Sequence, residues 1–396
     1  MEVEIGRGKK ARRAYGFDDI AVVPSRRTRD PDDVDISWKL GDYRFELPLL
    51  ASAMDGVVSP TTAGIVGKLG GLAVLNLEGI FTRYEDADEQ LERISSLPKE
   101  IATREMQEIY REPIKPELIA ERIKEVKSQG VVAAASLTPQ RVRKYYELAL
   151  EAGLDILVIQ GTVVSAEHVS ATTEPLNLKE FIADMPVPVV VGGCASYHTG
   201  LHLMRTNAAG VLVGVGPGAA CTTRGVLGIG VPQATAIADV AAARSQHMLE
   251  TGEYIKVIAD GGMRTGGDVA KAIACGADAV MIGSPLARAH EAPGRGYHWG
   301  MATFHPTLPR GARVATTQNG TLEEILIGPA RENDGTFNLM GGLRTSMATC
   351  GYEDIAEFNR AELMVAPALQ TEGKQLQRDQ QVGMGSNGRA ALLVND

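Results

Sequence analysis

Short apolar runs alternate with longer amphipathic stretches along most of this chain. Each run is followed by a Gly or polar turn and then by ten to fifteen residues in which apolar positions recur at helical spacing. This alternation is typical of consecutive βαβ units. Amphipathic helices are predicted over 117–128, 140–152 and 233–250. Eight apolar runs are candidate strands: 49–51, 72–75, 131–135, 156–159, 187–191, 211–213, 256–259 and 279–282.

Eight units of this kind predict an α/β fold, a TIM (β/α)8 barrel with eight parallel strands. The active site of such a barrel is built from the loops at the C-terminal ends of its strands. A doubly wound parallel sheet is the alternative fold. It predicts a GxGxxG turn after the first strand and an acidic residue about twenty positions later. The sequence contains neither feature, so the barrel is preferred.

Two segments interrupt the alternation. Residues 78–118 are charged and have few β-branched residues, so they are predicted to form a surface excursion with a short helix at 86–95. From residue 297 the pattern becomes irregular and rich in Gly, Thr and Arg, which predicts an active-site cover over 297–370. The whole is interpreted as one catalytic domain, 1–375, followed by a polar tail, 376–396.

Composition narrows the class of protein. A chain of 396 residues with 44% hydrophobic content can bury a large core. The net charge of −9 argues against a nucleic-acid or anionic-membrane partner. No apolar stretch is long enough to span a membrane and the N-terminus lacks the apolar core of a signal peptide, so a cytoplasmic location is expected. The four cysteines have no metal-ligand spacing, and none is expected to form a disulfide.

Cys221 is the first candidate for chemistry. The apolar run 210–213 opens into Gly-Val-Gly-Pro-Gly-Ala-Ala-Cys-Thr-Thr-Arg-Gly over 214–225. Glycines let the backbone approach a ligand, and the cysteine stands where a helix can begin. Helix N-terminal N–H groups favour the thiolate, which is the nucleophilic form. A small buried hydrophobe is the commoner role of a cysteine. Glycines and hydroxyls make poor core filler, however, so the nucleophile is preferred.

A second pair of motifs predicts a phosphate site. Residues 256–267 read Lys-Val-Ile-Ala-Asp-Gly-Gly-Met-Arg-Thr-Gly-Gly, and 276–284 read Gly-Ala-Asp-Ala-Val-Met-Ile-Gly-Ser. Each is a strand that ends in glycine before a helix, at the seventh and eighth positions of the barrel. Backbone N–H groups of these two loops commonly bind phosphate. One Gly-Gly turn alone could simply close a loop, but two in tandem beside Asp260 favour a ligand, with Asp260 facing ribose hydroxyls.

These motifs resemble the IMP dehydrogenase/GMP reductase family over roughly residues 15–303. The resemblance implies a TIM barrel that binds a purine nucleotide monophosphate and a nicotinamide cofactor, and that assembles as a homo-tetramer or octamer. It is carried by Ala-Ser-Ala-Met-Asp at 51–55, the cysteine loop with 228–233, Ile-Ala-Asp-Gly-Gly-Met-Arg at 258–264, Met-Ile-Gly-Ser at 281–284 and Tyr-Gly-Phe-Asp-Asp-Ile-Ala-Val-Val-Pro at 15–24.

The resemblance assigns catalytic roles to three residues. Cys221 would attack C2 of the purine and form a covalent thioimidate. Thr223 would lie close to the reacting carbon. Glu291 matches the acidic residue that faces Thr223 across the site. In isolation Glu291 would be taken for a solvated glutamate, and only its register with the family favours the catalytic role.

The resemblance also assigns the binding residues. Gly262, Gly283 and Ser284 would hold the phosphate, and Asp260 the ribose. The remaining nucleotide contacts would come from Met54, Gly218, Gly261, Gly300 and Met301. The cofactor would contact Gln160 and Gly161, and carbonyls of Gly216, Gly218 and Cys221 could hold a monovalent cation such as K⁺.

Two positions depart from the family pattern. Gln160 stands where the family has an aspartate that contacts the nicotinamide amide, although one amide can still hydrogen-bond another. Cys194, in Gly-Gly-Cys-Ala-Ser at 192–196, stands where the family has a Gly-Asn turn. We interpret Cys194 as structural rather than catalytic.

The family catalyses two reactions, and the sequence favours one of them. IMP dehydrogenases use an Arg-Tyr pair on a flap to activate water, and residues 297–335 contain no such pair. The tandem regulatory insertion usual in dehydrogenases is also missing. The sequence therefore predicts a GMP reductase that uses NADPH to convert GMP to IMP and ammonia.

Two alternatives stay open. An NAD-dependent IMP dehydrogenase would need another base, for which His290, His298 and His305 are candidates. A non-catalytic purine nucleotide sensor would need only the phosphate site. The intact cysteine loop and Glu291 argue against the sensor, which has no use for a thiol at that position.

Overall fold

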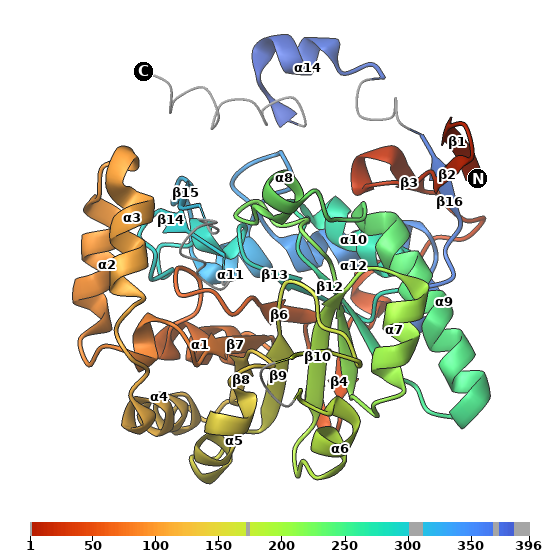
Figure 1. The fold of residues 1–396 in the computed structure, drawn as a ribbon. Helices are drawn as coiled ribbons and strands as arrows, with labels where there is room; N and C mark the ends of the chain where they lie inside the picture. Colours follow the sequence, from red (N-terminus) through yellow and green to blue (C-terminus); the bar gives the residue numbers. More distant parts are fainter. Residues whose placement is uncertain (1, 172–174, 301–311, 367–371, 384–396) are drawn as a thin grey trace.

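A closed parallel barrel forms the centre of the protein, as predicted (Figure 1). The computed structural model describes residues 2–171, 175–300, 312–366 and 372–383. The barrel closes where β13 pairs with β6, with Met281 opposite Leu50. This closure excludes the doubly wound sheet. The strands in order are β6 (Leu49–Ala51), β7 (Leu72–Asn76), β8 (Ala134–Leu137), β9 (Ile156–Gln160), β10 (Val189–Cys194), β11 (Gly210–Val213), β12 (Lys256–Asp260) and β13 (Ala279–Ile282).

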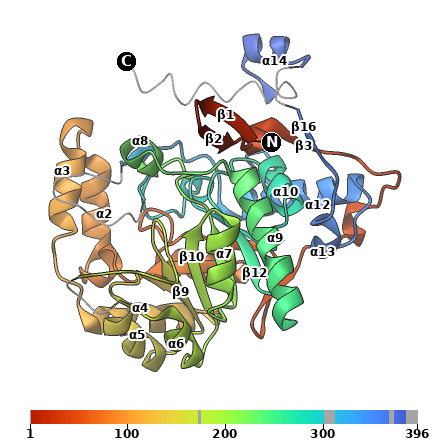
Figure 2. The same ribbon diagram turned by 45° about the vertical axis from the view of Figure 1, so that its right-hand side comes forward.

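Six of the eight predicted strands coincide closely with observed strands, and the third and the fifth are displaced toward the C-terminus, to β8 and β10. The apolar run 131–135 begins in a loop, because Val131 packs against Gly67 of a neighbouring helix before β8 starts at Ala134. Helices surround the barrel (Figures 1 and 2). They are α1 (Pro60–Lys68), α4 (Pro116–Ser128), α5 (Val142–Glu151), α6 (Leu178–Ala183), α7 (Tyr197–Met204), α9 (Gln233–Thr251) and α10 (Gly266–Ala274).

Apolar side chains fill the barrel from inside. Leu50, Val158 and Ile258 belong to a fully buried cluster that is separate from the layer between strands and helices. A hairpin of β4 (Trp38–Leu40) and β5 (Tyr43–Phe45) contributes its apolar side chains to the same cluster. Since this hairpin packs against the starts of the strands, it plugs the N-terminal end and leaves the opposite end for ligands.

The predicted surface excursion at 78–118 is more substantial than expected. It contains two helices, α2 (Ala87–Ser96) and α3 (Lys99–Ile109), where the sequence predicted one. It is also not confined to the surface, because Ile94 and Ile109 are buried. Apolar positions in α3 recur at helical spacing, but charged residues between them hide the pattern.

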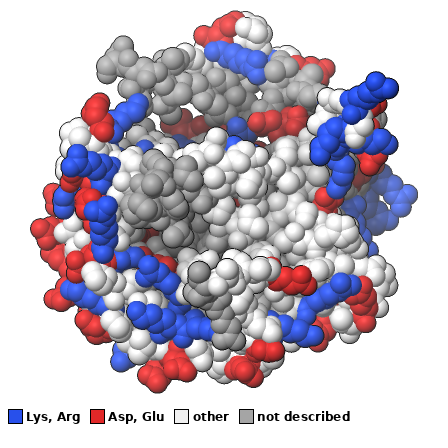
Figure 3. Space-filling model, viewed as in Figure 1, with Lys and Arg blue, Asp and Glu red and all other residues white. Residues whose placement is uncertain are grey.

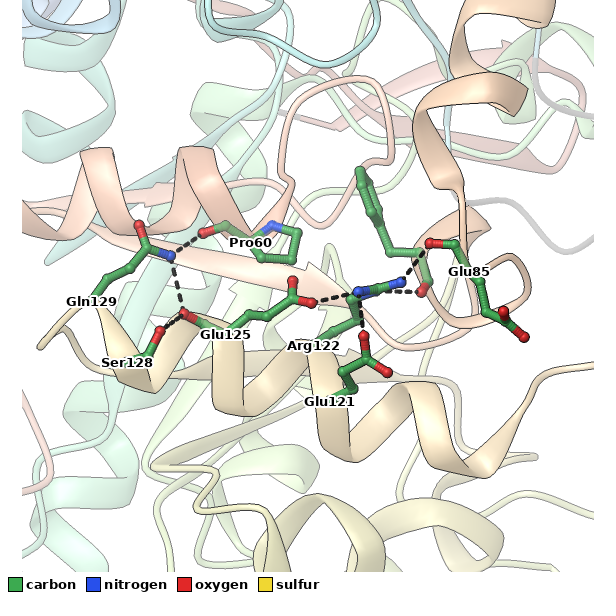
Figure 4. A network of polar contacts seen from close by, with 8 residues as sticks. Pro60, Glu85, Glu121, Arg122, Glu125, Ser128 and Gln129 are labelled. Atoms are coloured by element: carbon green, nitrogen blue, oxygen red, sulfur yellow. Dashed lines mark hydrogen bonds and ion pairs between the residues drawn. The ribbon is translucent and has the colours of Figure 1, made fainter.

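Arg122 of α4 ties the excursion to the barrel (Figure 4). Its Nε donates to the Phe81 carbonyl at 3.0 Å, and its Nη2 donates to the Glu85 carbonyl at 2.9 Å. At the C-terminal end of this helix, the C-cap residue Gln129 donates to the Pro60 carbonyl at 2.7 Å. One face of α4 therefore holds both the start of the excursion and the start of α1.

The described residues of the predicted irregular cover include several short helices and strands, although most of them lie outside regular elements. The segment 297–370 contains β14 (Tyr297–His298), β15 (Val314–Ala315), α11 (Leu322–Leu326), α12 (Leu339–Thr349), α13 (Ile355–Phe358) and β16 (Leu363–Val365). Helix α12 packs on α10, and a Cβ on Gly266 would lie 3.1 Å from the Gly342 Cα. Helix α12 therefore forms part of an outer layer against the helices of the barrel.

The two ends of the chain add small elements that the sequence did not predict. An N-terminal hairpin joins β1 (Glu2–Gly6) to β2 (Lys9–Arg12), and β16 pairs with β3 (Ile20–Val22), as Figure 2 shows. The predicted polar tail begins with a short helix, α14 (Gln375–Gln380), and its last residues lie outside the described ranges.

Charged side chains of both signs are interspersed around the periphery of the face seen in Figure 3, whose centre has few of them. Within the described parts of the chain, none of the helices has the length and apolar content needed to cross a membrane.

Asp278 makes the most deeply buried ion pair among the described residues. Its carboxylate accepts hydrogen bonds from Arg244 Nη1, the Tyr254 hydroxyl and Val257 N, each at 2.8 Å. The Asp278 and Arg244 side chains are only 5% and 9% exposed. This carboxylate joins α9 to the first residues of β12 and β13.

Replacing Asp278 with Ala should reduce the free energy of unfolding by about 3–5 kcal/mol, because it leaves the Arg244 guanidinium buried without its counter-charge. Urea denaturation measures the change. Asp239→Ala is the control. Asp239 lies on α9, as Arg244 does, but it pairs with the exposed Arg12. An equal, small effect of both variants would contradict the prediction.

Candidate active site

A cavity of about 290 Å³ lies at the C-terminal ends of the barrel strands. Its wall is formed by residues at the ends of β9, β12 and β13, by residues that follow β6, β9, β11, β12 and β13, and by Gly300 beyond β14. Among the described residues that line it, only Asp260 and Arg264 carry charged side chains. Arg264 is paired with Asp18 and Asp268, so the cavity presents mainly backbone groups and one carboxyl group to a ligand.

The cavity brings together most of the residues that the sequence singled out. Thr223 is buried behind Cys221 and Glu291 is not on the wall, while Met301 lies outside the described residues. The predicted residues that line the cavity are Met54, Gln160, Gly161, Gly216, Gly218, Cys221, Asp260, Gly261, Gly262, Gly283, Ser284 and Gly300.

Cys221 is the only cysteine of the four that is not buried. Its N–H donates to the Gly218 carbonyl at 3.0 Å, and its thiol donates to the Thr223 Oγ1 at 3.2 Å. Helix α8 (Thr223–Leu227) begins two residues later. By contrast, burial raises the pKa of Cys194 to about 12. Cys194 is therefore an inert thiol inside the fold, whereas Cys221 faces the cavity.

Asp260 and Gln160 form a half-buried polar pair at the ends of β12 and β9. Gln160 Nε2 donates to the Asp260 carboxylate at 3.1 Å. Burial raises the pKa of Asp260 to about 7, and the Gln160 hydrogen bond opposes only part of that effect. The Oε1 atom of Gln160 is buried and has no hydrogen-bond partner among the described residues. The pair thus offers one carboxyl group and one unused acceptor to a polar ligand.

The glycines of the two predicted phosphate loops are required by geometry. Gly261 and Gly262 have φ values of +79° and +85°, which side chains other than glycine rarely adopt. A Cβ on Gly283 would lie 2.6 Å from the Met54 sulfur. These positions keep the backbone accessible and let Met54 pack against the loop.

His298 is a polar residue near the site whose place the sequence did not reveal. Its Nε2 lies 2.8 Å from the Ser284 Oγ, and its side chain is 2% exposed. Burial lowers the pKa of His298 to about 4, so the imidazole is neutral at neutral pH. His298 does not line the cavity, and His305 lies outside the described residues. His298 is thus placed to orient the Ser284 hydroxyl rather than to reach a ligand.

Glu291 has a different partner from the one expected. Its carboxylate accepts the Leu322 N–H, with distances of 3.1 and 3.2 Å to its two oxygens. This N–H belongs to the first turn of α11, which needs acceptors for its free N–H groups. Capping of α11, rather than a contact with Thr223, is therefore the interaction that the described residues give Glu291.

No group of three or more His, Cys, Asp or Glu side chains among the described residues could hold a metal ion. The monovalent cation predicted at Gly216, Gly218 and Cys221 would bind carbonyls instead. The Gly218 carbonyl accepts the Cys221 N–H and keeps a second lone pair. The cation site stays a prediction.

Gln233 is a further contributor whose role the sequence did not show. Its Nε2 donates to the Val213 carbonyl at 2.7 Å and to the Asp260 carbonyl at 3.1 Å. It therefore joins the ends of β11 and β12, which carry the cysteine loop and the first phosphate loop.

A (β/α)8 barrel whose cavity is lined by an accessible cysteine and two glycine-rich loops has the architecture of a barrel enzyme. Residues 14–374 match the IMP dehydrogenase / GMP reductase domain. The chain belongs to this family of oxidoreductases.

Relatives over nearly the whole chain support this assignment. An uncharacterized oxidoreductase of Mycolicibacterium smegmatis is 48% identical, over 92% of this chain and 99% of its own length. The inosine-5'-monophosphate dehydrogenase of Methanocaldococcus jannaschii is 26% identical over 92% and 95%. The crystal structure of an IMP dehydrogenase/GMP reductase-like protein from Corynebacterium glutamicum has a TM-score of 0.87 and 46% identity, over 92% and 97%.

Replacing Asp260 with Asn should stabilise the protein, and more so at pH 8 than at pH 5. The pKa of Asp260 is higher in the folded than in the unfolded state, so the wild type loses stability as pH rises from about 4 to about 7. The neutral amide avoids this loss and keeps an acceptor for Gln160.

Thermal unfolding at the two pH values measures the difference. The exposed Asp42→Asn is the control, and it should show no such pH dependence. A gain that is equal at pH 5 and pH 8 would contradict the assigned titration of Asp260.

Proposed function

We propose that this protein is a GMP reductase, which uses NADPH and one proton to convert GMP to IMP, ammonia and NADP⁺. The observation that carries the proposal is the partly exposed Cys221 thiol on the cavity wall, 3.2 Å from the Thr223 hydroxyl. The preference for reduction over dehydrogenation rests on residues 297–335, which lack an Arg-Tyr pair to activate water.

In the proposed mechanism, the Cys221 sulfur adds to C2 of GMP and the C2–amine bond breaks. The departing amine must take up a proton. Thr223 is proposed to pass a proton to the amine, because its hydroxyl lies close to the sulfur that holds C2. Glu291 would resupply that proton, for which it must turn away from the Leu322 N–H. Once C2 has received the hydride that the cofactor would supply, collapse of the adduct breaks the S–C2 bond and restores the thiol.

The nucleotide would be held mainly by backbone groups. The loops at Gly262 and Gly283 present N–H groups to the phosphate, and the Ser284 hydroxyl would donate to it. Asp260 would accept hydrogen bonds from the ribose hydroxyls. Met54, Gly300 and Met301 are proposed to contact the base.

The residues at β9 suit a nicotinamide cofactor. The buried Oε1 of Gln160 has no partner, and a carboxamide N–H is a donor that would satisfy it. Gly161 follows on the same wall and leaves room for the ring. When bound, NADPH supplies the hydride that replaces the amine at C2. The enzyme is further proposed to be cytoplasmic and to assemble as a homo-tetramer or octamer.

An NAD-dependent IMP dehydrogenase is the second candidate, and two observations favour it. The relative from Methanocaldococcus jannaschii carries that name, and Glu291 contacts Leu322 N rather than Thr223. This reaction needs a base for water. His298 is a poor candidate for this base, because its Nε2 is hydrogen-bonded to the Ser284 hydroxyl and its side chain does not line the cavity.

Two assays of reduced nicotinamide absorbance decide between the candidates. We expect the signal to fall with GMP and NADPH and to stay constant with IMP and NAD. Cys221→Ala should abolish turnover and keep GMP binding, since the nucleophile is lost but the phosphate and ribose contacts remain. Cys275→Ala is the control, because Cys275 is buried away from the cavity.

Other results of these assays would overturn the proposal. A rise in the second assay alone would identify an IMP dehydrogenase. Binding of GMP or IMP without turnover in either assay would indicate a nucleotide sensor.

Glu291→Gln tests the proton supply. Glutamine keeps an acceptor for the Leu322 N–H, so the fold should persist, but it cannot deliver a proton. Ammonia release should therefore fall by about 10²-fold or more. Glu323→Gln is the control and should leave the rate unchanged, because Glu323 lies on the exposed side of α11. If the two variants behave alike, Glu291 only caps α11.

A further inference from the structure

The hydroxyl of Tyr110, at the end of α3, joins three segments that are far apart in sequence. It donates to the Asp55 carboxylate at 2.5 Å and accepts from Trp299 Nε1 at 2.6 Å. Asp55 follows β6, Tyr110 belongs to the 78–118 excursion, and Trp299 follows β14. Asp55 is 1% exposed and Trp299 is 3% exposed, so both hydrogen bonds are inside the protein.

The Asp55 carboxylate is enclosed on all sides by donors. It also accepts from Asn76 Nδ2 at 3.2 Å and from Ile80 N at 3.0 Å. The chain passes so close that a Cβ on Gly79 would overlap its Oδ1, at 1.9 Å. A carboxylate held by fixed donors cannot easily change its position, so the Tyr110 hydroxyl is held as well.

Each partner of Tyr110 is the direct neighbour of a residue on the cavity wall. Met54 precedes Asp55 and Gly300 follows Trp299, and both line the cavity. The Tyr110 hydroxyl therefore connects two parts of the wall that are far apart in the sequence.

The excursion is fixed firmly enough to serve as a support. Arg122 ties its first residues to α4, as described above (Figure 4). At its far side, Arg313 donates to the Ile94 and Leu97 carbonyls at the end of α2, and its guanidinium lies 4.1 Å from the centre of the Tyr297 ring. The excursion is thus contacted by Trp299, which precedes residues 301–311, and by Arg313, which follows them.

We propose that Tyr110 is a positioning residue, and that the excursion sets the Met54 and Gly300 walls of the purine site through it. The proposal rests on the proposed function, because that function makes Met54 and Gly300 contacts of the base. It adds a role for the 78–118 segment, which otherwise has no part in the reaction.

Tyr110→Phe tests the proposal, because it removes one hydroxyl and keeps the ring. The dissociation constant for GMP should rise by about 5- to 20-fold, the loss expected for one hydrogen bond in a network that shapes a binding wall. The KM for GMP should rise similarly, while kcat changes less than threefold because Cys221 and Thr223 are untouched. The fluorescence of Trp299 should also change, since its Nε1 loses its acceptor.

Tyr84→Phe is the matched control. Its hydroxyl donates to the Ile109 carbonyl within the same excursion, at 2.8 Å, and reaches neither Asp55 nor Trp299. It should leave KM and nucleotide affinity as in the wild type, even if it lowers thermal stability.

Three results separate the possible failures. If Tyr110→Phe binds GMP as the wild type does, the positioning role is wrong. If it loses only kcat and thermal stability, in parallel with Tyr84→Phe, Tyr110 merely stabilises the fold and the proposal is again wrong. If the wild type binds neither GMP nor IMP, the proposed function itself fails.

Discussion

Closure of the barrel is the constraint on which the rest of the structure depends. The hydrogen bonds between β13 and β6 bring residues near 50 against residues near 281, and this places every strand end on one rim. The hairpin with Trp38 and Phe45 fills the other end. Several loops can therefore contact one ligand together, although each loop contributes only a few binding groups.

The sequence predicted the parts of the fold that follow a simple period. Apolar runs such as 279–282 coincide with observed strands, because a strand buried on both faces is apolar throughout. Helix α3 was missed because its few buried positions are separated by charged residues. Helix α12 was missed because the Gly and Thr content of the 297–370 segment suggests a loop, whereas Gly266 and Gly342 allow α10 and α12 to pack closely.

The candidate site was predictable where the chemistry lies in short motifs. The cysteine loop and the two glycine-rich turns are contiguous in sequence, so Cys221 and Asp260 could be named directly. The supporting contacts are not contiguous. Tyr110 with Asp55, and His298 with Ser284, pair residues whose meeting depends on the three-dimensional path of the chain. Spacing along the sequence carries no signal for such pairs.

The uneven burial of the four cysteines has a chemical consequence for the protein in a cell. Three thiols are shielded inside the fold, while Cys221 stands at the wall of an open cavity. Peroxide or an electrophilic small molecule would therefore meet a single reactive sulfur, and sulfenic acid formed there could be reduced again by thiols. The feature that makes the site a candidate catalyst also makes it the point at which oxidative stress would stop it.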